Sequence, residues 1–272
     1  MEINLCLYSN DKYKTPRQIL KNWAIVSGCF DKVQEYDREW LEKTEFFKEN
    51  ESILNDPESK GDGWWLWKPY IIKKSFESME EGDILMYLDS SDTFFGDFRN
   101  FLLNHFRSHD FLLTRAGGNH NSWYTKRDTF FYMGCDTPEY WGAIQLEAGV
   151  IAFKKNKNTI KFVDEWLEYC KDYRIVTNCD NECGLENIPG YIAHRNDQSV
   201  LTNLKVKYKE VDNSDIMTHV LCNLWDFVLA KDYPSFNERV WNVAATTGGQ
   251  FSYIFRTWYI NYVLPLTEKM HK

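Results

Sequence analysis

Apolar and polar positions follow two different spacings along the chain, and the shorter spacing marks the strands. Ile3, Leu5 and Leu7 take every second position, which predicts a first strand that ends near residues 8–10. Residues 84–88 form a continuous apolar run after Asp83, which is typical of a strand that is buried on both faces. Further strands are predicted at residues 30–36, 110–114, 148–153 and 206–208.

The longer spacing marks helices at residues 16–26, 40–50, 64–79, 160–170 and 199–204. Within the third of these, Pro69 is compatible with a helix only in the first turns. Strands and helices that alternate in this way predict an α/β fold with a mostly parallel central sheet and helices on both faces. Because ligands bind such sheets at the carboxyl ends of the strands, we expect the chemistry just after each apolar run.

The chain length sets the domain organisation. With 272 residues, the chain is long for one domain and short for two. We expect one domain over residues 1–210 and an extension over residues 211–272. Phe251 to Leu264 is the most apolar part of the extension, but it is too short to span a bilayer, and we expect no transmembrane segment. We expect this segment to pack on the domain or on a second copy of the chain.

Composition narrows the choice of ligand. The net charge is −8 and no basic stripe occurs, which argues against nucleic acid as a partner. An acidic protein that binds a diphosphate would need a divalent cation to balance the charge. Aromatic residues make up 17% of the chain, and those that are not needed in the core suit a cleft for sugar rings, whose apolar faces stack on Trp and Tyr.

The seven cysteines indicate a reducing compartment. Their number is odd, their spacing is irregular, and the first residues lack the basic and apolar parts of a signal peptide. We therefore expect free thiols in the cytoplasm, with peripheral contact to a membrane as the alternative. Cys179 and Cys183 precede His194, but this isolated spacing lacks a second ligand pair and does not favour a zinc site.

The first segment with candidate chemistry follows the buried strand 84–88. Asp89 and Asp92 stand there with two serines between them. Carboxylates at a strand end suit Mg²⁺ or Mn²⁺, which usually take one or two carboxylates together with phosphate and water. The structural alternative is a polar turn that ends the strand.

Two later segments carry further polar side chains. Glu147 precedes the strand 148–153, in which Gly149 allows a close approach of the backbone to a ligand; an edge carboxylate beside a bulge is the alternative. His194-Arg195-Asn196-Asp197-Gln198 precedes the helix that starts at Ser199. Asp197 or Ser199 is expected either to act at a site or to cap that helix.

Three motifs follow one another along the chain: an acidic pair after a strand, a Glu-Ala-Gly-Val strand and an Asp-Gln pair before a helix. In this order they resemble the motifs of GT-A glycosyltransferases. The order is close to that of the glycogenin-like and lipopolysaccharide galactosyltransferase families, in which Asn-x-Gly-Val and Asp-Gln hold the sugar. Gly61 to Asp92, with Trp-Leu-Trp-Lys-Pro-Tyr at its centre, is also similar to microbial and viral enzymes of surface-glycan synthesis. The resemblance covers residues 3–208 and implies a Rossmann-like GT-A fold.

The resemblance also implies an activity and its residues. It implies a metal-dependent transfer of a hexose from a nucleotide-diphosphate sugar, foremost a UDP-sugar, to a glycan or lipid-linked glycan acceptor in surface polysaccharide synthesis. Asp89 and Asp92 are expected to bind Mn²⁺ or Mg²⁺, with residues 1–210 as the catalytic domain and residues 211–272 on the acceptor side or in a homo-oligomer contact. The carboxylates expected at the anomeric carbon are Asp197 and Glu147, and the residues expected to bind the donor are Tyr8, Ser9, Lys68, Asp89, Ser91, Arg195 and Gln198.

The sequence departs from the family pattern at three places. The usual Asp-x-Asp is Asp89-Ser-Ser-Asp92, so the second metal ligand is Ser91, Asp92 or neither. Glu147 replaces the Asn of Asn-x-Gly-Val, and His219 is a weak candidate for the late histidine ligand. A base at residue 147 or 197 would give inversion at the anomeric carbon, whereas two positioning carboxylates would allow retention.

Three other classes of protein stay open at this point. A sugar nucleotidyltransferase shares the fold and the metal, but it carries a glycine-rich loop after its first strand, and residues 8–12 contain no glycine. A non-catalytic carbohydrate-binding domain would explain the aromatic residues but not the polar clusters at three strand ends. A glycoside hydrolase would use two carboxylates without a metal.

Overall fold

The computed structural model describes residues 1–221. The strands of this part are β1 (Ile3–Ser9), β2 (Lys32–Asp37), β3 (Ile84–Leu88), β4 (Thr93–Phe94), β5 (Phe111–His120), β6 (Ile144–Lys154) and β7 (Val220–Leu221). The helices are α1 (Lys14–Ser27), α2 (Arg38–Glu42), α3 (Glu45–Glu49), α4 (Glu51–Leu54), α5 (Gly61–Trp64), α6 (Trp67–Glu77), α7 (Phe98–His105), α8 (Arg127–Tyr132), α9 (Pro138–Trp141), α10 (Lys157–Cys170), α11 (Tyr173–Val176) and α12 (Asn196–Tyr208).

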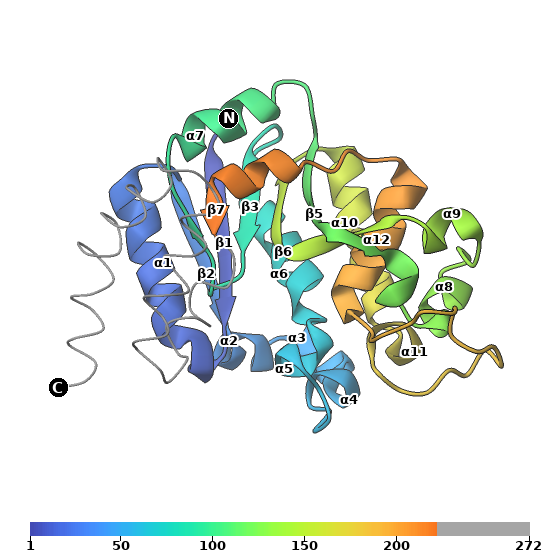
Figure 1. The fold of residues 1–272 in the computed structure, drawn as a ribbon. Coiled ribbons are helices and arrows are strands. Elements are labelled where there is room, and N and C mark those ends of the chain that lie inside the picture. The colour runs from blue at the N-terminus through green and yellow to red at the C-terminus, as the bar shows by residue number, and fades with distance from the viewer. Residues whose placement is uncertain (222–272) are drawn as a thin grey trace, which may run out of the picture.

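A five-stranded sheet in the order β2-β1-β3-β6-β5 forms the centre of the molecule. β1 pairs in parallel with β2 and β3, while β6 runs antiparallel to β3 and β5. β1, β2, β3 and β5 therefore point in one direction. Figure 1 shows α1 on one side of the sheet and α6, α10 and α12 on the other. This confirms the predicted α/β fold with a mostly parallel sheet and helices on both faces.

Two hydrophobic cores lie on the two faces of the sheet, and the alternation along β1 explains both. Ile3, Leu5 and Leu7 enter the core that contains residues of α1 and α7. Cys6 and Tyr8 point to the opposite face and enter the core that contains residues of α6, α10 and α12. Every residue of β1 and β3 is buried, as expected for strands covered on both faces.

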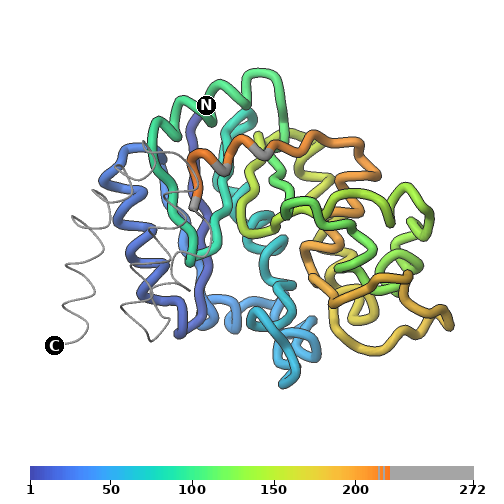
Figure 2. The backbone as a smooth tube through the Cα atoms, in the orientation of Figure 1, coloured from blue at the N-terminus to red at the C-terminus, as the bar shows by residue number. Residues whose placement is uncertain are grey.

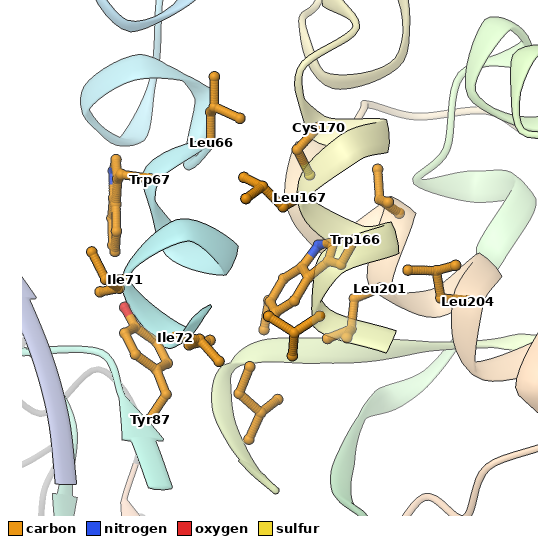
Figure 3. Close-up of a cluster of buried hydrophobic side chains, with 14 of the residues drawn as sticks. Leu66, Trp67, Ile71, Ile72, Tyr87, Trp166, Leu167, Cys170, Leu201 and Leu204 are labelled. Atoms are coloured by element: carbon orange, nitrogen blue, oxygen red, sulfur yellow. The ribbon is translucent and has the colours of Figure 1, made fainter. Parts of the chain in front are cut away.

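The larger core packs α6, α10 and α12 together, and α6 and α12 carry residues of the candidate active site. Figure 3 shows Ile72 of α6, Trp166 and Leu167 of α10, and Leu201 of α12 together in this core. The Trp166 ring is fully buried, and its Nε1 donates a hydrogen bond of 3.0 Å to the backbone carbonyl of Asp197. The same indole thus fills the core and fixes the first turn of α12.

Two predicted elements differ from the structure. The strand predicted at residues 206–208 is wrong, because these residues form the last turn of α12. Tyr208 packs on Phe162 of α10, with ring centroids 5.2 Å apart. The segment is too short for its pattern to distinguish a strand from a helix, so this packing determines its helical structure. The helix predicted over 40–50 is two helices, α2 and α3, because Thr44 caps a new start by accepting a hydrogen bond from the amide of Phe47.

The helix predicted over 64–79 begins only at Trp67, with Pro69 in its first turn as expected. The residues before it form a left-handed turn, in which φ is +58° at Gly61, +63° at Asp62, +97° at Gly63, +57° at Trp64 and +58° at Trp65. A left-handed backbone costs a non-glycine residue about 1–2 kcal/mol. Surrounding contacts hold the turn, because the indole of Trp67 donates to the carbonyl of Gly61 over 2.8 Å.

Residues 212–221 return from α12 across the sheet. Asn213 donates its amide to the carbonyl of Leu113 in β5, and β7 pairs with β4. Figure 2 shows this segment in orange, running from α12 back toward the N-terminal strands. The remainder of the predicted extension, including Phe251 to Leu264, lies outside the described residues. Within residues 1–221, no helix has the length and apolar character needed to cross a bilayer.

The position of Trp166 generates a stability prediction. Trp166→Ala should lower the free energy of unfolding by roughly 3–5 kcal/mol, because it leaves a cavity between α6, α10 and α12 and removes the hydrogen bond to Asp197. Urea unfolding followed by circular dichroism measures this change. Val26→Ala is the control, since Val26 of α1 is 68% exposed and its loss should change stability by no more than about 0.5 kcal/mol. Equal losses in both variants would contradict the prediction.

Candidate active site

A cleft of about 600 Å³ opens at the carboxyl ends of β1 and β3. The sheet places it there because β1 and β3 are parallel neighbours that end at the same edge. Its lining includes four of the residues expected from the sequence: Tyr8, Ser9, Asp89 and Ser91. The other lining residues are Asn10, Lys12, Tyr13, Ser59, Gly61, Asp62, Trp65, Trp67, Tyr87 and Ser90.

The wall of the cleft at β1 is aromatic and tightly fixed. The ring of Tyr8 stacks on Trp67, with centroids 3.8 Å apart, and its hydroxyl donates a hydrogen bond to Asp62 in the left-handed turn. Burial and the Asp62 carboxylate raise the pKa of Tyr8, so the phenol stays protonated. The buried hydroxyl of Ser9 has no hydrogen-bond partner among residues 1–221 and is therefore available to a bound molecule.

The acidic pair after β3 is arranged around Gly149. The hydroxyl of Tyr87 donates a 2.6 Å hydrogen bond to Oδ1 of Asp89, and the amide of Asp89 donates to the carbonyl of Gly149. A Cβ on Gly149 would stand 2.7 Å from Oδ2 of Asp89 and 3.5 Å from Oδ2 of Asp92. Only a glycine therefore leaves room at the point where the two carboxylate oxygens come together.

This arrangement fits a divalent cation. Mg²⁺ and Mn²⁺ prefer oxygen ligands and take one or two carboxylates, with phosphate oxygens and water in the remaining positions. Asp89 lines the cleft, and an oxygen of Asp92 also lies near the position that a Cβ of Gly149 would take, so the two residues supply two such carboxylates. Within residues 1–221, no group of three or more His, Cys, Asp and Glu is placed to hold a metal by itself, so the other ligands would come from the bound molecule.

Lys68 connects this pair to the first turn of α12. Its Nζ lies 3.3 Å from Oδ1 of Asp89, 3.5 Å from Oδ2 of Asp197 and 3.0 Å from the carbonyl oxygen of Ala148, to which it donates a hydrogen bond. The side chain is only 3% exposed. Burial lowers the pKa of Lys68, but the two carboxylates outweigh this effect and raise it, so the ammonium stays charged. The expected contact of Lys68 with phosphate stays a prediction.

Asp197 lies inside α12 and does not cap it. The N-cap position belongs to Arg195, and no side chain caps the helix there. Burial raises the pKa of Asp197 to about 6, against the lowering effect of Lys68, and its Oδ2 forms no hydrogen bond within residues 1–221. A buried carboxylate with a raised pKa and a specific charged partner is typical of a functional site.

Gln198 and Glu147 complete the surroundings of Asp197. Gln198 accepts a hydrogen bond from the amide of Ala148 and donates one to Gln145, so its amide fixes α12 on β6. Burial raises the pKa of Glu147, while the nearby Arg195 guanidinium opposes this effect. Arg195 itself is exposed and lies over the ring of Tyr124, at 4.8 Å from the centroid. All expected catalytic and metal-binding carboxylates therefore gather around Lys68, Ala148 and Gly149.

The two histidines considered from the sequence have structural roles. His194 is buried, its Nε2 lies 2.9 Å from the carbonyl oxygen of Ile175, and burial lowers its pKa to about 3, so the ring stays neutral. His219 packs on Phe101, with ring centroids 4.7 Å apart. Neither histidine joins the acidic pair, and the weak expectation of His219 as a metal ligand is wrong for this reason.

Sequence reasoning missed three residues at this site. Asp62 and Tyr87 make the hydrogen bonds that orient Tyr8 and Asp89, and the ring of Trp65 lines the cleft. Gly61-Asp-Gly63 was the signal for Asp62, because paired glycines indicate an unusual backbone. Tyr87 gave none, since a tyrosine within an apolar run looks like any other core residue.

No protein-family model and no curated protein sequence matches the chain. Among solved structures, mouse xyloside xylosyltransferase 1 is similar at 11% identity and a TM-score of 0.40, over 78% of this chain and 84% of that chain. The galactosyltransferase LgtC is similar at 13% identity and a TM-score of 0.37, over 74% of this chain and 70% of that chain. A glycosyltransferase involved in glycosylation of the major capsid of PBCV-1 is similar at 13% identity and a TM-score of 0.37, over 71% and 82%.

Proposed function

We propose that this protein is a metal-dependent glycosyltransferase that moves a hexose from a nucleotide-diphosphate sugar, foremost a UDP-sugar, to a glycan or lipid-linked glycan acceptor. One observation carries the proposal. The carboxylates of Asp89 and Asp92 both approach Gly149, Asp89 lines an aromatic cleft, and a single buried lysine joins Asp89 to the buried carboxylate of Asp197. The motif order supports surface polysaccharide synthesis in the cytoplasm as the setting.

Each part of the site has a place in this reaction. The nucleoside would bind in the cleft between Tyr8, Trp65 and Trp67, with the free hydroxyl of Ser9 as a polar contact. Asp89 and Asp92 would hold Mn²⁺ or Mg²⁺, which supplies positive charge to the diphosphate as it leaves. The acidic chain needs this charge, because its own net charge is −8.

The carboxylates of Asp197 and Glu147 would act at the anomeric carbon. Glycosyl transfer develops positive charge there, and an ionised carboxylate stabilises it. The raised pKa of each group also suits a base that accepts the proton of the acceptor hydroxyl near neutral pH. A base role for either residue would give inversion, whereas two positioning carboxylates would leave the configuration retained.

Binding of UDP, GDP and CMP with and without Mn²⁺, measured by calorimetry, tests the proposal directly. We expect a diphosphate to bind only in the presence of the cation. A glycosyltransferase should then release the diphosphate from its sugar donor. A nucleotidyltransferase should instead form the nucleotide-sugar from nucleoside triphosphate and sugar phosphate. Cation-independent binding of sugars alone would indicate a carbohydrate-binding domain and contradict the proposal.

Asp89→Asn should weaken Mn²⁺-dependent nucleotide binding by about a hundredfold or more, because it removes one of two charges at the cation. Calorimetric titration measures the loss. Asp180→Asn, at an exposed position, is the control and should bind like the parent protein. Undiminished binding in the Asp89 variant would remove this residue from the metal site.

Gly149→Ala tests the space between the two carboxylates. Its Cβ would stand 2.7 Å from Oδ2 of Asp89, so Mn²⁺-dependent binding should weaken by about tenfold or more while the fold is kept. Gly118→Ala is the matched control, because Gly118 has no heavy atom within 4 Å of the same position. If both variants bind Mn²⁺ and nucleotide equally well, the cation does not lie above Gly149.

The pKa of Asp197, about 6, predicts an acid limb in the pH profile of transfer. The group must be ionised to act, so turnover should fall as the pH drops through about 6. Asp197→Asn should lower turnover by about a hundredfold and flatten this limb, while Mn²⁺-dependent nucleotide binding stays close to the parent value. Thermal stability should fall, because the buried ammonium of Lys68 loses one of its two carboxylate partners. Turnover rates measured from roughly pH 5 to pH 8, at intervals of about half a pH unit, check this prediction. A variant that keeps the parent rate would show that the charge of Asp197 is not used.

A further inference from the structure

The surface on the β6 side of the site is not part of the cleft. The sheet order is β2-β1-β3-β6-β5, and the cleft lies at the ends of β1 and β3. Glu147 on β6 pairs with Thr114 on β5, and the segment of residues 121–124 directly follows β5. Arg195 lies over Tyr124 of this segment and its charge acts on Glu147, so the segment lies near Glu147.

Trp123 and Tyr124 in this segment are fixed to the helix that carries Asp197. The backbone carbonyl of Tyr124 accepts hydrogen bonds from the amide of Arg195 at 3.0 Å, the hydroxyl of Ser199 at 2.8 Å and the amide group of Gln145 at 3.3 Å. The carbonyl of Trp123 accepts the amide of Ile192 at 2.8 Å. The position of the segment relative to α12 and β6 is therefore rigid.

The side chains of this surface include an exposed aromatic face and an open cation. Trp123 is 37% exposed, and its ring lies beside Gly190, where a Cβ would come within 3.4 Å. The guanidinium of Arg195 lies over the ring of Tyr124, at 4.8 Å from the centroid, and Arg195 is exposed. Among residues 1–221, no carboxylate lies within ion-pair distance of Arg195, so its N–H donors are free for a ligand, while its charge reaches Glu147.

We propose that Trp123, Tyr124 and Arg195 form the subsite for the acceptor, and that the acceptor presents a pyranose ring there. The ring would stack its apolar face on Trp123 and accept hydrogen bonds from Arg195 through its hydroxyls, with the reacting hydroxyl toward Glu147. This inference rests on the proposed function, and it assigns the acceptor class and the residues that select it.

The chemistry of the surface favours a sugar over a lipid tail or a peptide. A sugar ring has one apolar face and a rim of hydroxyls, which matches a surface that carries one exposed indole and one guanidinium with free donors. A lipid tail would leave the Arg195 donors without partners. The exposed indole also has low conformational freedom, so little entropy is lost when a ring binds to it.

Saturation-transfer NMR with methyl glycosides of glucose, galactose and mannose tests the subsite, in the presence of UDP and Mn²⁺. We expect at least one glycoside to bind the parent protein. Trp123→Ala should weaken that binding by about tenfold, and Trp123→Phe should restore most of it, because a phenyl ring keeps a stacking face. Phe131→Ala is the matched control, since Phe131 is a 47% exposed aromatic residue on α8, and it should bind like the parent protein.

The outcomes separate this inference from the proposed function. Calorimetry with UDP and Mn²⁺, together with slow hydrolysis of the sugar donor by water, should be unchanged in Trp123→Ala, because Trp123 does not line the cleft. If nucleotide binds but no glycoside does, or if Trp123→Ala binds the glycoside as well as the parent protein, the subsite is overturned and the proposed function stands. If no nucleotide binds the parent protein, both fall.

Discussion

The buried ammonium of Lys68 is the interaction on which the rest of the site depends. It lies within 3.5 Å of Asp197 and 3.3 Å of Asp89, and it donates to the carbonyl of Ala148. Without this charge, the partly exposed carboxylate of Asp89 would repel the buried carboxylate of Asp197, and the protonated form of Asp197 would be favoured. Removal of one partner from a buried ionic group leaves an uncompensated charge, which is strongly destabilising. The ammonium therefore sets both the spacing and the charge of the site.

The three partners of Lys68 come from three different parts of the fold. Asp89 ends β3, Ala148 lies in β6, and Asp197 lies in the first turn of α12, which Trp166 and Gln198 hold against α10 and β6. None of these contacts is local in sequence, so the site exists only when the sheet and both cores have formed. The glycine at position 149 then lets the carboxylates of Asp89 and Asp92 approach the backbone of β6.

Much of the fold could be predicted from the sequence, because buried strands such as 84–88 and amphipathic helices such as 160–170 carry strong periodic patterns. The carboxylates could be named because each follows or precedes an apolar run. Their mutual geometry could not, since it depends on Lys68, whose burial no local pattern indicates. The error at residues 206–208 has a related cause: the packing of Tyr208 on Phe162 decided the structure of a short ambiguous segment. Asp197 could not be assigned as cap or site residue until the start of α12 was known.

The left-handed turn at residues 61–65 has a consequence for how this protein can diversify. A side chain at position 61 would overlap the ring of Trp65, with a Cβ only 2.0 Å away, and one at position 63 would meet the backbone of Leu54 at 2.7 Å. A substitution at either glycine would therefore disturb Trp65 or the backbone of Leu54, so this wall of the cleft cannot change one residue at a time. Variation of the cleft would have to occur at other lining positions, such as Lys12 and Tyr13, or replace the whole turn at once.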